Sequence, residues 1–110
     1  MDSFQMQFLI WEAQFQPGVD PSRIQMFLFG IVKLKQRLKE LRELVDTRKP
    51  EQSINAEKKS IGATVEDFAK RVVQNLTQEE KRFLTNRQMV RKEFMDPNFW
   101  LKQISQTAHS

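Results

Sequence analysis

The sequence contains no cysteine and no tyrosine, and it has three glycines, four prolines and one histidine among 110 residues. Without cysteine, the chain forms no disulfide, no thiolate metal site and no thiol nucleophile. The one histidine, His109, lies at the C-terminal end, so a histidine-ligated metal is not expected. Three widely spaced glycines exclude a glycine-rich phosphate loop. We therefore predict a protein with no metal, no cofactor and no enzymatic activity.

Long apolar runs are also missing. The two longest cover residues 8–11 and 26–32, and Gly30 interrupts the second. Both are much shorter than the roughly 20 residues that cross a bilayer. The opening Met1-Asp2-Ser3 lacks the positive charges that begin a secretion signal. We expect no stable membrane insertion and an intracellular location.

The composition is that of a folded helical protein with a basic balance. Hydrophobic residues make up 39% and charged residues 29% of the chain, and the net charge is +4. We predict one all-α domain over residues 1–104, built as a small bundle of four to five helices, with a frayed tail at 105–110. A positive net charge favours polyanionic partners without identifying one.

The strongest pattern is a long helix over residues 21–49 that forms the centre of the bundle. Asp20 provides a cap and Pro21 a proline at the first helical position. An apolar seam then follows with alternating steps of three and four residues, for about 42 Å of helix. Because a seam this long must be covered, we predict that it pairs with a second copy of the chain as a homodimer. The seam consists of Ile24, Phe27, Ile31, Leu34, Leu38, Leu41 and Val45.

Other segments give weaker signals. We predict a first helix over residues 2–15 and a polar connector over residues 49–60. Thr64 with Asp67, and Thr77 with Glu80, each resemble a capping box, so helices are expected after both. The second of these is expected to run to about residue 95, and Asp96-Pro97 to begin a short last helix. The core is expected to include both tryptophans, the first helix's aromatic stripe and the apolar start of the long helix: Phe4, Phe8, Trp11, Phe15, Met26, Leu28, Phe29, Val32 and Trp100.

Basic residues accompany the seam of the long helix. As a solvated flank, they would form pairs such as Lys39–Glu43 and Arg42–Asp46. As a phosphate-binding surface, two paired helices would present a composite track of cations to a nucleic-acid duplex. Both interpretations remain open. A second basic group near residues 81–92 is more typical of a solvated surface. The candidate nucleic-acid-binding residues are Lys33, Lys35, Arg37, Lys39 and Arg42.

Several strings show a resemblance to a known family. They are the start Met1-Asp2-Ser3 with Phe-Leu-Ile-Trp at 8–11, the run 69–80 and the connector 50–62. Together they resemble the N-terminal RNA-binding domain of influenza-type non-structural protein 1. The resemblance implies a viral homodimer that binds double-stranded RNA through the basic segment 33–42 and antagonises host antiviral defence. Its location would then be the host cytoplasm or nucleus. Glu40 and Glu43 depart from the family by interrupting the basic segment.

Three functions are compatible with these patterns. The first is a helical homodimer that binds double-stranded RNA with little sequence preference. It would have the host-defence role that the resemblance implies. The alternative is a helical subunit or adaptor that docks on other proteins, host proteins among them, and has no nucleic-acid role. A third is peripheral contact with a membrane through the phenylalanine-rich first helix.

Overall fold

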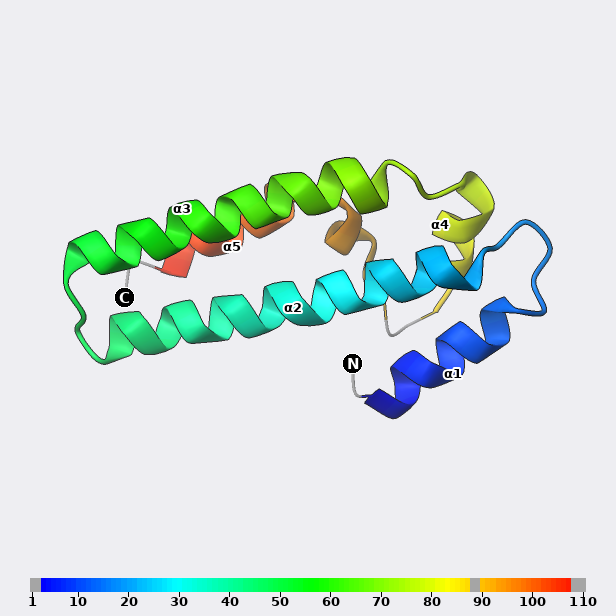
Figure 1. Cartoon of the computed structure of the whole chain (residues 1–110), viewed down its shortest axis with the longest axis horizontal. Helices are drawn as coiled ribbons and strands as arrows, with labels where there is room; N and C mark the ends of the chain where they lie inside the picture. Colours follow the sequence, from blue (N-terminus) through cyan, green and yellow to red (C-terminus); the bar gives the residue numbers. More distant parts are fainter. Residues whose placement is uncertain (1–2, 88–89, 108–110) are drawn as a thin grey trace.

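The computed structural model describes residues 3–87 and 90–107, and these ranges contain five α-helices and no strand. The predicted all-α bundle is confirmed. A π-helical turn, η1, follows the third helix, and a 3₁₀ turn, η2, precedes the last (Figure 1). The elements are α1 (Ser3–Ala13), α2 (Pro21–Asp46), α3 (Glu51–Phe68), η1 (Ala69–Val73), α4 (Gln78–Thr85), η2 (Lys92–Met95) and α5 (Pro97–Thr107).

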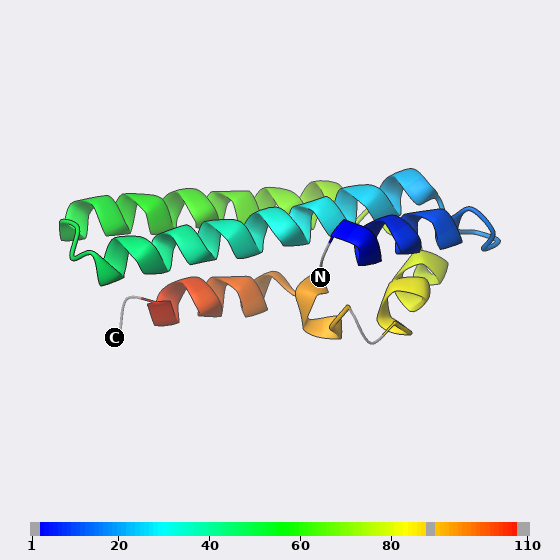
Figure 2. The same cartoon turned by 90° about the horizontal axis from the view of Figure 1, so that it is seen from below.

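The long helices α2 and α3 form an antiparallel hairpin that spans the molecule (Figure 1). Helix α5 runs along one face of this hairpin, and Figure 2 shows it as a second layer beneath α2 and α3. Helix α1 packs against the first half of α2, and α4 lies at the open end of the hairpin. The result is an elongated bundle with extents of 50 × 26 × 19 Å.

The start of α2 follows the predicted signal. The Asp20 side chain accepts a hydrogen bond from the Ser22 amide at 2.9 Å, and Pro21 occupies the first helical position. The end comes at Asp46, earlier than the predicted residue 49. There the chain reverses at Arg48, whose φ of 56° lies in the left-handed region. The Arg48 and Lys49 amides donate to carbonyls one turn back, which terminates the helix as a Schellman motif.

The apolar seam of α2 is covered by its own chain. Six of its seven residues, Ile24 through Leu41, are buried, and Val45 is half-buried. Helices α3 and α5 supply the covering side chains, including Val65 and Trp100. The prediction that the seam pairs with a second copy is therefore wrong. The chain turns back on itself, and its own helices bury the seam within one molecule.

Close packing between α2 and α3 depends on a glycine. A Cβ atom at Gly30 would lie 2.2 Å from Cε2 of Phe68, which is far inside van der Waals contact. The Phe68 ring in turn stacks beside Phe27, with ring centroids 5.6 Å apart. Gly30 therefore interrupts the apolar run of α2 in order to admit a ring from the partner helix.

The predicted polar connector over residues 49–60 is wrong. Helix α3 begins at Glu51, directly after Pro50, so the loop between the long helices is only residues 47–50. The segment has few apolar residues because it needs only a narrow contact: Ile54 and Ile61 face the bundle and most of the rest is exposed. The predicted cap at Thr64 is also wrong, since the Thr64 hydroxyl donates to the Ser60 carbonyl inside the helix at 3.1 Å.

The later predictions are partly confirmed. Thr77 and Glu80 form the predicted capping box at the start of α4. This helix ends at Thr85, with Asn86 as its C-cap, instead of continuing to residue 95, although Phe83, Val90 and Phe94 keep a helical spacing. Helix α5 begins after Asp96 as predicted and continues to Thr107, so residues 105–107 are not a frayed tail. Residues 1–2, 88–89 and 108–110, His109 among them, lie outside the described ranges.

Candidate interaction surface

The five predicted nucleic-acid-binding residues do not form one surface. On helical steps of about 100°, Lys33 and Arg37 lie on one side of the seam and Lys35, Lys39 and Arg42 on the other. Lys35 places its ammonium 4.8 Å from the centroid of the Phe94 ring. Lys33, Lys39 and Arg42 are exposed, and none forms an ion pair with a described residue. The expected Lys39–Glu43 and Arg42–Asp46 pairs are thus absent from the part of the chain that is described.

Arg37 has a structural role instead. Its Nη1 donates to Thr64 Oγ1 at 2.9 Å, and its Nη2 donates to Glu57 Oε1 at 3.0 Å and to Ser60 Oγ at 2.9 Å. All three acceptors lie on α3, and Arg37 itself is half-buried. The guanidinium therefore ties α2 to α3 and has few donors left for a phosphate.

The second basic group is also partly occupied by intramolecular contacts. Arg87 bonds the carboxylate of Glu12 in α1 and lies over the Phe83 ring. Arg91 pairs with Glu93 at 3.0 Å and lies near the ring of Phe94. The Arg87 contacts join α1 to the end of α4, whereas Arg91 contacts residues of η2, so the predicted solvated surface is wrong for Arg87.

The most unusual feature of the surface is the aromatic stripe of α1 and the turn that follows it. Phe4, Phe8, Trp11 and Phe15 are 78%, 48%, 55% and 65% exposed, so the prediction that they are core residues is wrong. Phe8 and Trp11 have ring centroids 6.1 Å apart, and Trp11 and Phe15 have centroids 5.1 Å apart. Phe8, Trp11 and Phe15 therefore form a row of neighbouring rings on the outside of the molecule.

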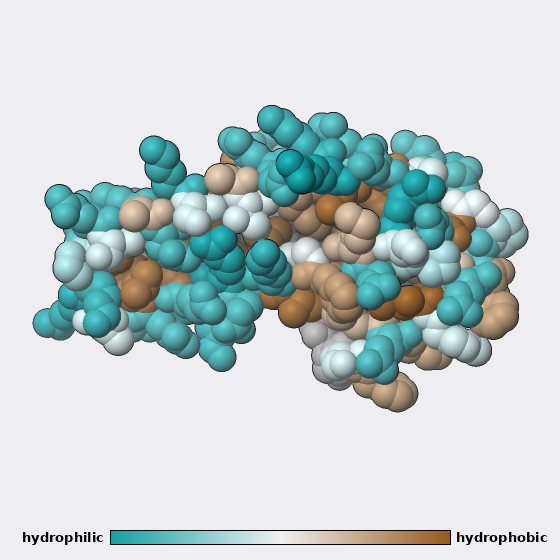
Figure 3. All heavy atoms as spheres, viewed as in Figure 1, coloured by the Kyte–Doolittle hydropathy of each residue, from teal (hydrophilic) through white to brown (hydrophobic). Residues whose placement is uncertain are grey.

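Helix α2 extends this stripe. Met26, Phe29 and Val32 are 53%, 49% and 41% exposed, so the prediction that they are core residues is wrong. Leu28, predicted with them, is buried. Figure 3 shows hydrophobic side chains gathered over α1 and the first half of α2, and a largely hydrophilic surface toward the α2–α3 turn. We call these seven exposed residues the apolar surface: Phe4, Phe8, Trp11, Phe15, Met26, Phe29 and Val32.

A groove between α1 and α2 joins the two parts of the apolar surface. Its volume is about 460 Å³, and Trp11 and Phe29 line it from opposite helices. The polar residues around it are uncharged. They are Ser3, Gln7, Gln14 and Gln25.

The apolar surface carries little charge. Within α1 the one charged residue is Glu12, and Arg87 already bonds it. On α2, several bases border it: Arg23, three residues before Met26, lines a pocket with that methionine, and Lys33 and Lys35 follow Val32 by one and three residues. A partner would therefore meet rings, methionine and amides, with cations only along the α2 edge.

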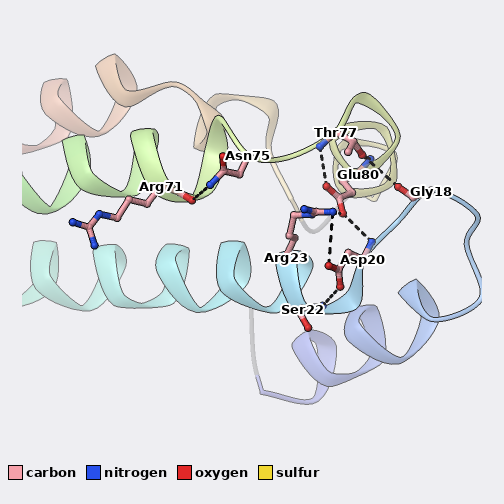
Figure 4. A network of polar contacts seen from close by, with 8 residues as sticks. All are labelled: Gly18, Asp20, Ser22, Arg23, Arg71, Asn75, Thr77 and Glu80. Carbon is pink, nitrogen blue, oxygen red and sulfur yellow. Dashed lines mark hydrogen bonds and ion pairs between the residues drawn. The ribbon is translucent and has the colours of Figure 1, made fainter.

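A polar network fixes the loop that connects α1 to α2. Glu80 of α4 is fully buried, and its carboxylate accepts hydrogen bonds from the Thr77 and Asp20 amides at 2.8 Å each and from Arg23 Nε at 3.2 Å (Figure 4). Burial alone would raise the pKa of Glu80, but these donors outweigh it and lower the pKa. The ionised side chain thus holds the start of α2 against α4. It thereby also fixes the end of the loop that connects α1 to α2.

The sequence does contain a signal for the exposed rings. Helix α1 has apolar residues on both faces: Phe4, Phe8 and Trp11 on one, and Met6, Leu9 and Ala13 on the other. Only one face of a helix at the edge of a bundle can be covered. The smaller stripe is the one buried against α2, because less bulky side chains let the two helices approach closely. Two competing stripes on one short helix therefore indicate an exposed apolar face.

No group of three or more His, Cys, Asp or Glu residues within the described ranges is arranged to hold a metal ion. None of the helices in those ranges is long and apolar enough to span a membrane.

Comparisons with family models, with curated proteins and with solved structures find no match for this chain. The resemblance to influenza-type non-structural protein 1, and the RNA-binding and host-defence roles that it implies, therefore stay predictions.

Proposed function

We propose that this protein is a helical interaction module that binds another protein through its apolar surface. The observation that carries this proposal is the exposure of the four rings of α1 and the turn that follows it, together with three apolar residues of α2. If a complete aromatic side chain offers about 200 Å², the seven residues leave roughly 700 Å² of mainly apolar surface in water. The largest patch on a typical monomer is about 300–600 Å² and is often a binding site.

The composition of this surface favours a protein partner. Aromatic residues and methionine are enriched where proteins bind one another, whereas charged residues are depleted. A helix that lies in a lipid interface usually presents lysine and arginine beside its apolar face, and α1 has neither. Phosphate binding requires cations, and those near the apolar surface, Arg23, Lys33 and Lys35, lie only at its α2 border.

A selection from a displayed library of helical peptides tests the proposal, with the chain at high dilution as bait. Selected peptides should carry an apolar stripe. The Trp11→Gln variant should weaken their binding by about 30-fold or more, since buried tryptophans are frequent hot spots. Because Trp11 is exposed, the variant should keep the fold, which circular dichroism verifies.

The matched control is Arg42→Gln, which changes an exposed residue on the other half of α2 and should leave peptide binding unchanged. If no selected peptide distinguishes wild type from Trp11→Gln, the proposal is wrong.

Duplex RNA binding is the second candidate. The exposed side chains of Lys39 and Arg42 favour it, since no described carboxylate pairs with them and they share a flank of α2 with Lys35. A single row of three cations predicts weak binding that falls steeply with salt. Titration of a labelled RNA duplex at low and moderate salt, with wild type and a Lys39→Gln/Arg42→Gln variant, measures it. Absence of binding at low salt discards this candidate.

A further inference from the structure

We infer that the partner of the apolar surface is a second copy of this chain, which docks its own apolar surface face to face about a two-fold axis. This inference rests on the proposed function and names its partner. It assigns dimerisation to the outer face of α1 and the first half of α2. The seam that the sequence suggested for pairing is buried within each copy.

The size of the surface suits a dimer. A specific interface of standard size covers about 800 Å² on each partner. The apolar surface leaves roughly 700 Å² exposed on each copy, and the surrounding glutamines add to the area that a partner would cover. One copy is therefore large enough to cover the other without a further subunit.

The shape of the surface is self-complementary. In a two-fold dimer each copy contributes the same patch, so a ridge must face a groove of its own kind. The rings of α1 form the ridge, and the groove between α1 and α2 lies beside it. A cavity of 150 Å³ already holds a benzene ring, so a groove of about 460 Å³ accepts a phenylalanine of the partner.

The charge distribution points to the same face. Two copies with a net charge of +4 repel each other, so they associate best where few cations meet. Helix α1 carries no base, and its Glu12 is neutralised by Arg87. The remaining helices expose lysines and arginines, among them Lys39, Arg42 and Lys102. Contact through the apolar surface keeps most of these cations apart.

Sedimentation equilibrium of the wild-type chain over a wide concentration range tests the inference. We expect a dimer that dissociates on dilution, with an affinity that stays constant or rises with salt because screening reduces the repulsion. Trp11→Gln should weaken dimerisation by about 100-fold or more, since each dimer carries the change twice. Phe4→Gln, at the most exposed ring, is the second variant in case Trp11→Gln unfolds. Arg42→Gln should dimerise as wild type does.

Fluorescence locates the interface. Trp100 is buried in each copy, so acrylamide should quench mainly Trp11. The quenching constant should fall as the dimer forms. A dimer in which Trp11 remains fully quenchable overturns the inference, because its interface lies elsewhere.

A chain that stays monomeric at millimolar concentration also overturns the inference. That result leaves the proposed function standing if selected peptides still bind wild type and not Trp11→Gln. Loss of both the dimer and the peptide binding shows that the proposed function itself is wrong.

Discussion

Single residues determine how the N-terminal part of the bundle is held. Glu80 is fully buried and ionised, and it connects the start of α2 to the start of α4 through three donors. Glu79, its neighbour, is exposed. Two adjacent glutamates therefore differ completely in their surroundings, and only the position after a capping threonine distinguishes them in the sequence.

We predict that Glu80→Gln lowers the free energy of unfolding at pH 7 by about 2–4 kcal/mol, because an amide cannot accept all three hydrogen bonds. Since the folded pKa of Glu80 is lowered, its stabilising effect is complete above the ordinary pKa of 4.5 and is lost as the pH falls through the lowered value. The difference between the variant and wild type should therefore shrink in acid. Urea unfolding between pH 7 and pH 2 measures it, with Glu79→Gln as control. A difference that is independent of pH would contradict the prediction.

Two glycines inside helices give opposite expectations. Gly30→Ala should destabilise the protein by about 1–2 kcal/mol, because the strain of displacing Phe68 exceeds the gain in helix propensity. Gly62→Ala places its Cβ at 3.8 Å from Leu101, an ordinary contact, so it should stabilise by about 0.5–1 kcal/mol. Thermal unfolding of both variants measures the pair. Equal shifts would show that the Gly30–Phe68 contact is relieved at little cost.

At the scale of elements, the turn between α2 and α3 decides the whole arrangement. Only residues 47–50 separate two long helices, so α3 must run back along α2 and cover its seam. The polar character of residues 51–60 concealed this, because a helix that contacts its neighbour along a narrow line needs few apolar residues. The regular spacing of apolar residues in α2 was sufficient to predict that helix. It did not predict that α3 packs against it.

Arg48 stands at the position of this turn that glycine usually occupies. We predict that Arg48→Gly stabilises the protein by about 1 kcal/mol, since glycine adopts a positive φ without steric cost. Lys49→Gly serves as control and should be neutral or slightly destabilising, because no positive φ occurs at that residue. Urea unfolding of the two variants gives the comparison. A destabilised Arg48→Gly would mean that the arginine side chain makes a compensating contact.

At the scale of the whole molecule, α5 closes the bundle. Trp100 and Ile104 lie against Leu34, Leu38 and Ile61 from the two long helices, and the Trp100 indole donates to the Phe94 carbonyl at 2.9 Å. The last helix thus completes the cover of the α2 seam. The same architecture leaves α1 covered on one side only, which is why its second stripe faces water.

Trp100→Ala should lower the free energy of unfolding by about 3–5 kcal/mol, because it opens a cavity where three helices meet. The partly exposed neighbour Leu101 is the control, and Leu101→Ala should cost about 1 kcal/mol or less. Denaturant unfolding of both variants tests the prediction. Similar losses for the two would show that α5 adds little to the core.

Local rules determined the helical class, the start of α2 at Asp20-Pro21, the Thr77–Glu80 box and the start of α5, since each depends on residues within one or two turns. Only the tertiary structure decided what each apolar stripe contacts. Periodicity shows that a helix has an apolar face but does not show whether α3, a second copy or water lies opposite. The α2 seam is covered by helices of the same chain. The rings of α1 face solvent, and from this exposed surface we infer a dimer.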